Sequence, residues 1–111
     1  MTDDRLAQIQ ERYRESLDGK ADDLEACWRS AQSDFLAEDR VSELRNLVHK
    51  LGGSAGMYGY DTLAGSAKAL EREITKGPVD SSERRKTVAD GVSALLTMLR
   101  NGGETTAPES S

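Results

Sequence analysis

The sequence predicts an all-α fold, an antiparallel four-helix bundle with an additional or kinked helix at its N-terminus. Apolar residues recur at steps of three and four over most of the chain, as on one face of a helix. The alternation of apolar and polar residues that is typical of strands is scarce, and both prolines lie outside the periodic segments. The 111 residues are enough for one hydrophobic core. Short connections between amphipathic helices favour antiparallel neighbours.

The first periodic segment predicts two helices, over residues 3–18 and 20–33, either separate or joined by a kink. Thr2 is the expected cap of the first helix. Gly19 is the expected break, because a glycine inside a helix costs about 1 kcal/mol relative to alanine. A connection over residues 33–39 follows. The positions expected to face the core are Leu6, Ile9, Tyr13, Leu17, Ala21, Leu24, Trp28, Ala31 and Phe35.

Three further helices are each expected to begin at an aspartate, a residue type that caps helix N-termini. The caps are Asp39, Asp61 and Asp80, the last one paired with Glu83 in an arrangement like a capping box. Glycine marks the helix ends, at Gly56 and Gly59, at Gly77 before Pro78, and at Gly102 with Gly103. The expected core positions are Val41, Leu44, Leu47, Val48, Leu51, Ala55, Leu63, Ala67, Leu70, Ile74, Val88, Val92, Leu95, Leu96 and Leu99. We therefore expect one helical domain over residues 1–101 and a disordered tail over residues 102–111.

Charge and cysteine content exclude several classes of function. A net charge of −5 does not support nucleic-acid binding, which needs a concentrated basic stripe. The single cysteine, Cys27, cannot form an internal disulfide, which indicates a reducing compartment, and no second Cys or His completes a metal site with it. The acidic start lacks the features of a signal peptide, and no apolar run is long enough to span a membrane. We expect a cytoplasmic monomer that binds neither nucleic acid nor membrane.

His49, the only histidine, stands out on the third helix. At about 100° per residue, the core positions of that helix fall within one arc, and His49 points roughly 130° away from its centre. We therefore expect the imidazole on the solvent side. A solitary histidine is most often a surface or core residue without a chemical role, so its neighbours have to be weighed.

Those neighbours are small or cationic. Gly52, Gly53 and Gly56 follow the histidine by three, four and seven residues and so share its face. Together they cost the helix roughly 2–3 kcal/mol relative to alanines. A bare surface leaves the imidazole accessible to a concave partner, and Arg45 and Lys50 supply cations for a phosphoryl oxygen. Alternatively, the glycines mark a helix end or a place where helices pack closely.

The run HKLGGSAGMYG over residues 49–59 resembles the histidine-containing phosphotransfer (HPt) domains of multistep two-component relays. Their hallmark is a helix with His-x-Leu-Lys/Ala-Gly-Ser/Ala-Ala/Ser, followed by a glycine that closes the turn. The likeness extends from Val41 to Ile74 and implies a four-helix bundle with an exposed phosphorylatable histidine.

The resemblance also implies a function. His49 would accept a phosphoryl group from the phosphoaspartate of one receiver domain and pass it to another in a two-component phosphorelay. The partners would be receiver domains of hybrid histidine kinases and response regulators. Such a receiver holds the Mg²⁺, so we expect this chain to bind no cofactor or metal and to have no kinase or ATPase activity. Neutral imidazole is the nucleophile, so transfer should fade at low pH.

Three more residues have roles that the resemblance implies. Gly53 occupies the family's near-invariant glycine position, where small size gives the receiver access. Glu71 stands where the family often has a polar residue that orients the imidazole, and Lys68 would serve similarly. Gly52 departs from the lysine of many members, so the cations on either side of the histidine, or the receiver, would supply that charge.

Two other functions remain as alternatives. A non-catalytic helical adaptor would dock a partner through the glycine-rich face. The other alternative is an autonomous enzyme, but the chain lacks a second catalytic group for it, because there is no other histidine, no cysteine pair and no phosphate-cradling loop.

Tyr58 and Tyr60 are expected to seal the bundle end.

Overall fold

The computed structural model describes residues 2–33, 37–77, 79 and 81–103, with side chains from residue 5 onward. All the regular structure in these ranges is α-helical, and the predicted all-α fold is confirmed. The helices are α1 (Thr2–Glu15), α2 (Leu17–Ser33), α3 (Glu38–Met57), α4 (Asp61–Thr75) and α5 (Ser82–Arg100).

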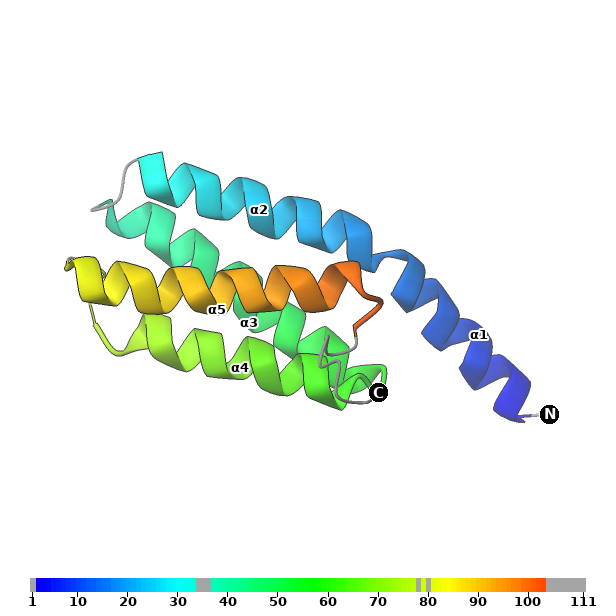
Figure 1. Cartoon of the computed structure of the whole chain (residues 1–111). Helices are drawn as coiled ribbons and strands as arrows, with labels where there is room; N and C mark the ends of the chain where they lie inside the picture. Colours follow the sequence, from blue (N-terminus) through cyan, green and yellow to red (C-terminus); the bar gives the residue numbers. More distant parts are fainter. Residues whose placement is uncertain (1, 34–36, 78, 80, 104–111) are drawn as a thin grey trace, which may run out of the picture.

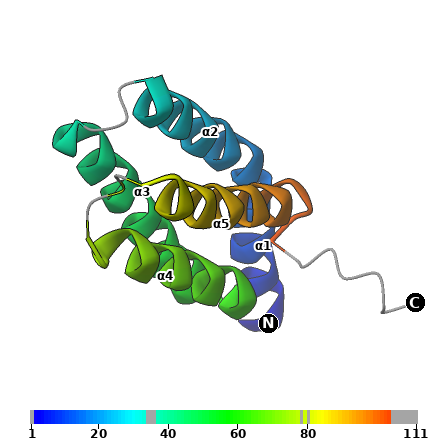
Figure 2. The same cartoon turned by 60° about the vertical axis from the view of Figure 1, so that its left-hand side comes forward.

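Helices α2 to α5 form an antiparallel up-down-up-down bundle (Figure 1). In the described residues, α3 packs against α2 and α4, and α5 packs against the same two helices, so the four helices stand at the corners of a square. The α3–α4 pair has the most extensive contact. Helix α1 extends beyond the end of the bundle (Figures 1 and 2); its backbone lies close only to that of α2, and its side chains reach the α3–α4 turn near residue 13.

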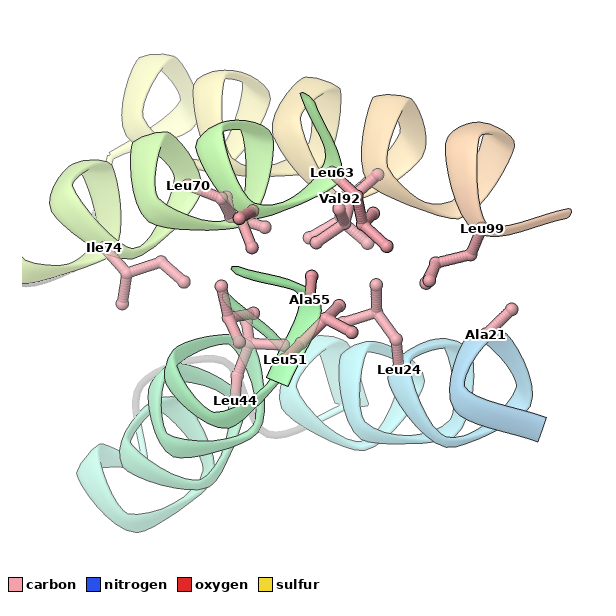
Figure 3. Packing of buried hydrophobic residues seen from close by; sticks show 14 of the residues in the cluster. Ala21, Leu24, Leu44, Leu51, Ala55, Leu63, Leu70, Ile74, Val92 and Leu99 are labelled. Atoms are coloured by element: carbon pink, nitrogen blue, oxygen red, sulfur yellow. The ribbon is translucent and has the colours of Figure 1, made fainter. Parts of the chain in front are cut away.

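The core lies along the axis of this bundle (Figure 3), where side chains from all four helices meet. Nearly all the predicted core positions are buried or packed against the buried cluster. Leu6 and Ile9 are exceptions, because they are 55% and 40% exposed. Their prediction was wrong because α1 extends past the bundle and has no helix opposite its apolar stripe. Phe35, another expected core residue, lies outside the described residues.

The break between α1 and α2 falls at Ser16 rather than at the expected Gly19. The Ser16 hydroxyl donates to the carbonyl of Tyr13 over 2.6 Å, a local bond that bends helices. The backbone amide of Ser16 still bonds to Arg12 and Tyr13, so the helix is bent and not interrupted. Gly19 lies inside α2 with open space at its Cβ position. The expected kinked N-terminal helix is therefore present, at a different residue.

The helix starts differ from the aspartate caps that were expected. The N-cap residues of α3 and α4 are Ala37 and Tyr60, and neither makes a side-chain cap bond. Asp39 and Asp61 lie instead in the first turns, where a carboxylate is favourable near the positive end of the helix dipole. The N-cap of α5 is Ser81, whose hydroxyl accepts from the amide of Arg84 over 3.1 Å. The expected caps Thr2 (side chain) and Asp80 lie outside the described residues, as does Pro78.

Glycines close α3 and α5 by the same device. Gly59 and Gly102 have φ angles of +84° and +73°, which favour glycine. The following amides reach back five residues, from Tyr60 to the carbonyl of Ala55 and from Gly103 to that of Met98, each over 2.8 Å. Both ends are therefore Schellman motifs. The structure describes the turn through Gly103, so residues 104–111 of the tail expected over residues 102–111 lie outside the described residues.

A tyrosine cluster joins α1 to the α3–α4 turn. The rings of Tyr13 and Tyr58 stack with centroids 4.6 Å apart, and Tyr60 lies 5.3 Å from Tyr13. The hydroxyl of Tyr13 lies 2.7 Å from that of Ser54 on α3, and Gln10 donates to the carbonyl of Tyr58 over 3.0 Å. The two turn tyrosines thus seal this end of the bundle, as expected.

Candidate functional site

The site is centred on His49, near the middle of α3. Leu44, Val48, Leu51 and Ala55 of the same helix are buried in the core. The His49 side chain lies off that stripe and is 70% exposed. The exposure predicted from the helical wheel is therefore what the structure shows, and the ring is accessible to a second molecule.

A hydrogen bond from the neighbouring helix orients the imidazole. Nδ1 of His49 lies 2.8 Å from Oε2 of Glu71 on α4. An ionised carboxylate can only accept, so the proton of a neutral imidazole must reside on Nδ1. The nitrogen that remains, Nε2, then has a free lone pair and is the nucleophilic atom of an exposed ring.

An open pocket of about 820 Å³ runs beside the imidazole along α4. Five residues line this pocket besides His49 and Glu71. They are Gly53, Lys68, Arg72, Thr75 and Lys76. Sequence reasoning missed Arg72, Thr75 and Lys76. The signal was present, because Lys68, Arg72 and Lys76 recur every four residues and so form one cationic row on α4.

The three glycines near His49 differ in their surroundings. Gly53 is exposed, and a Cβ at this position would meet nothing within 4 Å. Gly56 is exposed too, although a Cβ there would lie 3.7 Å from Cβ of Ala64. Gly52 is buried against α4, so its expected place on the open face is wrong. It lies where α3 and α4 pack against each other, which is the alternative considered for these residues.

The cations expected beside His49 are spread over two sides of α3. Arg45 and Lys50 are exposed. Lys50 lines a separate pocket between α2 and α3, together with Lys20 and Asp23. Lys68 lines the pocket of His49, but the hydrogen bond that orients the ring comes from Glu71. The structure thus separates two residues to which the sequence assigned one role.

In the part of the chain that the structure describes, neither Cys27 nor a cluster of metal-ligating side chains forms a second candidate site. Burial, and the nearby carboxylate of Glu43, raise the pKa of the Cys27 thiol, which therefore stays protonated and unreactive at neutral pH. Among the described residues, no group of three His, Cys, Asp or Glu side chains is placed to hold a metal ion. Within the same residues, none of the helices has the length and apolar character needed to cross a membrane.

Comparison with known families decides what this exposed histidine belongs to. The family model of the Hpt domain matches residues 2–102 of the chain. The chain belongs to the Hpt domain family. Hpt domains are phosphoryl carriers of phosphorelays and have no catalytic activity of their own, so this chain has a phosphotransfer role in signal transduction. Comparisons with curated proteins and with solved structures gave no match.

Proposed function

We propose that this Hpt domain accepts a phosphoryl group on His49 from the phosphoaspartate of a receiver domain and passes it to a second receiver. The observation that supports this most directly is the bond of 2.8 Å from Nδ1 to Glu71, made by a side chain that is 70% exposed. It combines a fixed tautomer with access from solvent. No other histidine competes for the role, since the chain has only one.

In the proposed step, the lone pair of Nε2 attacks the phosphorus of the phosphoaspartate. An N–P bond forms, the P–O bond to the aspartate breaks, and the aspartate carboxylate leaves with the bonding electrons. The imidazole keeps its proton on Nδ1 and becomes positively charged. Glu71 is well placed to stabilise this charge, because a charge-assisted hydrogen bond is stronger than a neutral one. The return step to a second receiver is the reverse.

The chain acts as a carrier in this proposal, and the receiver supplies the Mg²⁺ and the catalytic groups. Gly53 supports such docking, because its open surroundings let a concave active site close over the imidazole. Binding residues on the side of α4 would be the cations of the pocket. We place the carrier in the cytoplasm as a monomer, since its single cysteine suits a reducing compartment.

The test is transfer from a phosphorylated receiver to the purified chain. Wild-type protein should take up label that is acid-labile and base-stable, as phosphohistidine is. A His49→Gln variant should take up none, and Glu43→Gln, a change on the same helix outside the pocket, should behave as wild type. Label that persists in His49→Gln, or no label in wild type with a panel of receivers, would contradict the proposal.

The second candidate is a non-catalytic adaptor that docks a partner through the same face. The surface at Gly53 and Gly56 favours it, because both residues are exposed in the C-terminal part of α3. This adaptor would bind receivers equally well with His49→Gln and would never carry label. Release of phosphate from ATP by the purified chain would point instead to an enzyme.

A further inference from the structure

The side chain of Lys68 lies against the face of α3 at Gly52. A Cβ at Gly52 would lie 3.4 Å from Cγ of Lys68 and 3.5 Å from Cβ of Ala67. The Lys68 stem therefore begins in van der Waals contact with the position that a side chain at residue 52 would occupy. Lys68 also lines the pocket of His49 together with Gly53. The Lys68 side chain thus starts against the part of α3 one turn beyond the histidine and borders the same pocket as the imidazole.

The charge of Lys68 is available, whereas that of Lys76, at the far end of the row, is engaged. Nζ of Lys76 donates to Glu73 over 3.1 Å. Among the described residues, Lys68 has no ion-pair partner, and it is exposed. Lys50, which follows His49 in the sequence, lines a different pocket. Of the lysines near His49, Lys68 is therefore the one both free and within the pocket.

We propose that Lys68 binds the phosphoryl group carried by His49, acting from α4 in place of a side chain at position 52. This inference rests on the proposed function, because it requires a phosphoryl group on Nε2. A phosphoryl group on nitrogen bears two negative charges when fully ionised, and an ammonium group donates strong, charge-assisted bonds to its oxygens. Lys68 lowers the free energy of the phosphorylated state and of the transition state that leads to it. Gly52 contributes by leaving room for the lysine stem.

The test uses the whole chain and phosphoramidate, a small donor that needs no receiver. Nε2 attacks its phosphorus, the N–P bond of the donor breaks, and ammonia leaves with the bonding electrons. Lys68→Ala should lower the labelling rate of His49 by roughly threefold to tenfold, the range for loss of one partly exposed charged contact. Lys68→Arg should keep most of the rate. Lys86→Ala, which removes an equal charge from an exposed site on α5, should change nothing.

A second measurement distinguishes charge from structure. The ³¹P signal of the phosphohistidine shifts when the phosphoryl group gains its last proton, and a nearby cation holds that proton off. In Lys68→Ala the midpoint of this titration should move to higher pH, whereas in Lys86→Ala it should stay. A lysine that only packs against Gly52 would leave the midpoint where it is.

The charge can also be moved between helices. In the double variant Gly52→Lys with Lys68→Ala, the atom closest to a Cβ at residue 52 is gone, so the new side chain has room. Labelling should recover relative to Lys68→Ala alone, with helicity checked by circular dichroism. Three outcomes would each overturn the proposal. Lys68→Ala could keep the wild-type labelling rate and the wild-type ³¹P midpoint, or labelling could be slowed only in Arg72→Ala. The third is a folded double variant whose labelling does not recover. Absence of label in wild type with both phosphoramidate and receivers would instead refute the proposed function.

Discussion

At the scale of single residues, Glu71 controls His49 through the position of one proton. Free imidazole exchanges its proton between both ring nitrogens, and only the form with the proton on Nδ1 offers Nε2 as a nucleophile. The carboxylate of Glu71, 2.8 Å from Nδ1, selects that form. A side chain that lies 22 residues away in sequence thereby determines which ring nitrogen carries the free lone pair.

Glu71→Ala is expected to slow labelling of His49 by phosphoramidate about threefold to tenfold, the value of one hydrogen bond to a charged group at a partly exposed site. Nitrogen NMR of the ring should show a larger share of the form protonated on Nε2. Glu73→Ala, which removes a carboxylate of α4 that pairs with Arg84 and Lys76, is the matched control and should leave the ring unchanged. A wild-type proton distribution in Glu71→Ala would refute this account.

A larger side chain at Gly53 tests whether a receiver needs open space beside His49 to dock. Gly53→Gln should raise the free energy of unfolding by up to about 1 kcal/mol, because glycine is a poor helix former and the site is open. The same change should slow transfer from a receiver about tenfold, equivalent to about 1.4 kcal/mol of docking free energy. Gly19→Gln, at an equally open position on α2, should gain stability without losing transfer. Denaturant titration and receiver transfer measure the two effects.

At this scale the sequence predicted the exposure of His49 and the approach of Glu71 to its ring, but not the cationic row. The exposure of His49 follows from its angle to the core stripe of α3, which a wheel gives directly. Gly52 was misplaced because it lies at the border of that stripe, and a wheel does not show on which flank α4 packs. The same missing information hid Arg72 and Lys76, which become neighbours of His49 only through the pairing of α3 with α4.

At the scale of elements, the direction of α1 depends on the contacts of the tyrosine cluster more than on the helix propensity of α1 itself. Ser16 provides the bend, and the contacts of Tyr13 with Ser54 and Tyr58 hold α1 against the α3–α4 turn. Propensity placed the break at Gly19, but the burial of Leu17 and Ala21 on either side of it outweighs a cost of about 1 kcal/mol. Helix existence was therefore predictable, whereas the break and the caps depended on tertiary contacts.

The cluster has a consequence for stability at alkaline pH. Burial, aided by Tyr58 and Tyr60, raises the pKa of Tyr13 above its ordinary value of 10.0, although the bond to Ser54 opposes this. The unfolded chain therefore releases this proton at lower pH than the folded chain, and the free energy of unfolding falls as pH rises above about 10.

Tyr13→Phe should lose about 0.5–1.5 kcal/mol at neutral pH, the value of its hydroxyl bond. The same variant should lose less stability than wild type between neutral pH and about pH 11, because it has no proton to release at this position. Denaturant titrations at both pH values measure the difference. Parallel losses in the two proteins would show that Tyr13 does not contribute to the alkaline transition.

At the scale of the whole molecule, the core and the surface that carries the His49–Glu71 pair are separate parts of the bundle. Leu95 is fully buried on α5, while His49 and Glu71 lie on the outer side of α3 and α4. The antiparallel arrangement follows from short connections and was predictable. The sequence could not show that α1 would leave the bundle, because its stripe of Leu6 and Ile9 continues the periodicity of α2.

Leu95→Ala should lower the free energy of unfolding by about 2–5 kcal/mol, the usual range for a leucine truncated in a core. Labelling of His49 per folded molecule should stay at the wild-type rate. Leu6→Ala, at a position 55% exposed, should change stability by no more than about 0.5 kcal/mol. A comparable loss at both positions would mean that α1 has a covered face.

The bond between His49 and Glu71 joins two helices, and this makes phosphorylation and folding parts of one thermodynamic cycle. Whatever Glu71 adds to the stability of phosphohistidine disappears when the chain unfolds, so an equal amount must be added to the stability of the phosphorylated fold. The loaded carrier should therefore melt at a higher temperature than the empty one, and this difference should shrink in Glu71→Ala. The difference in melting temperature between the phosphorylated and the unphosphorylated chain, measured by calorimetry, would then report how strongly the fold stabilises phosphohistidine.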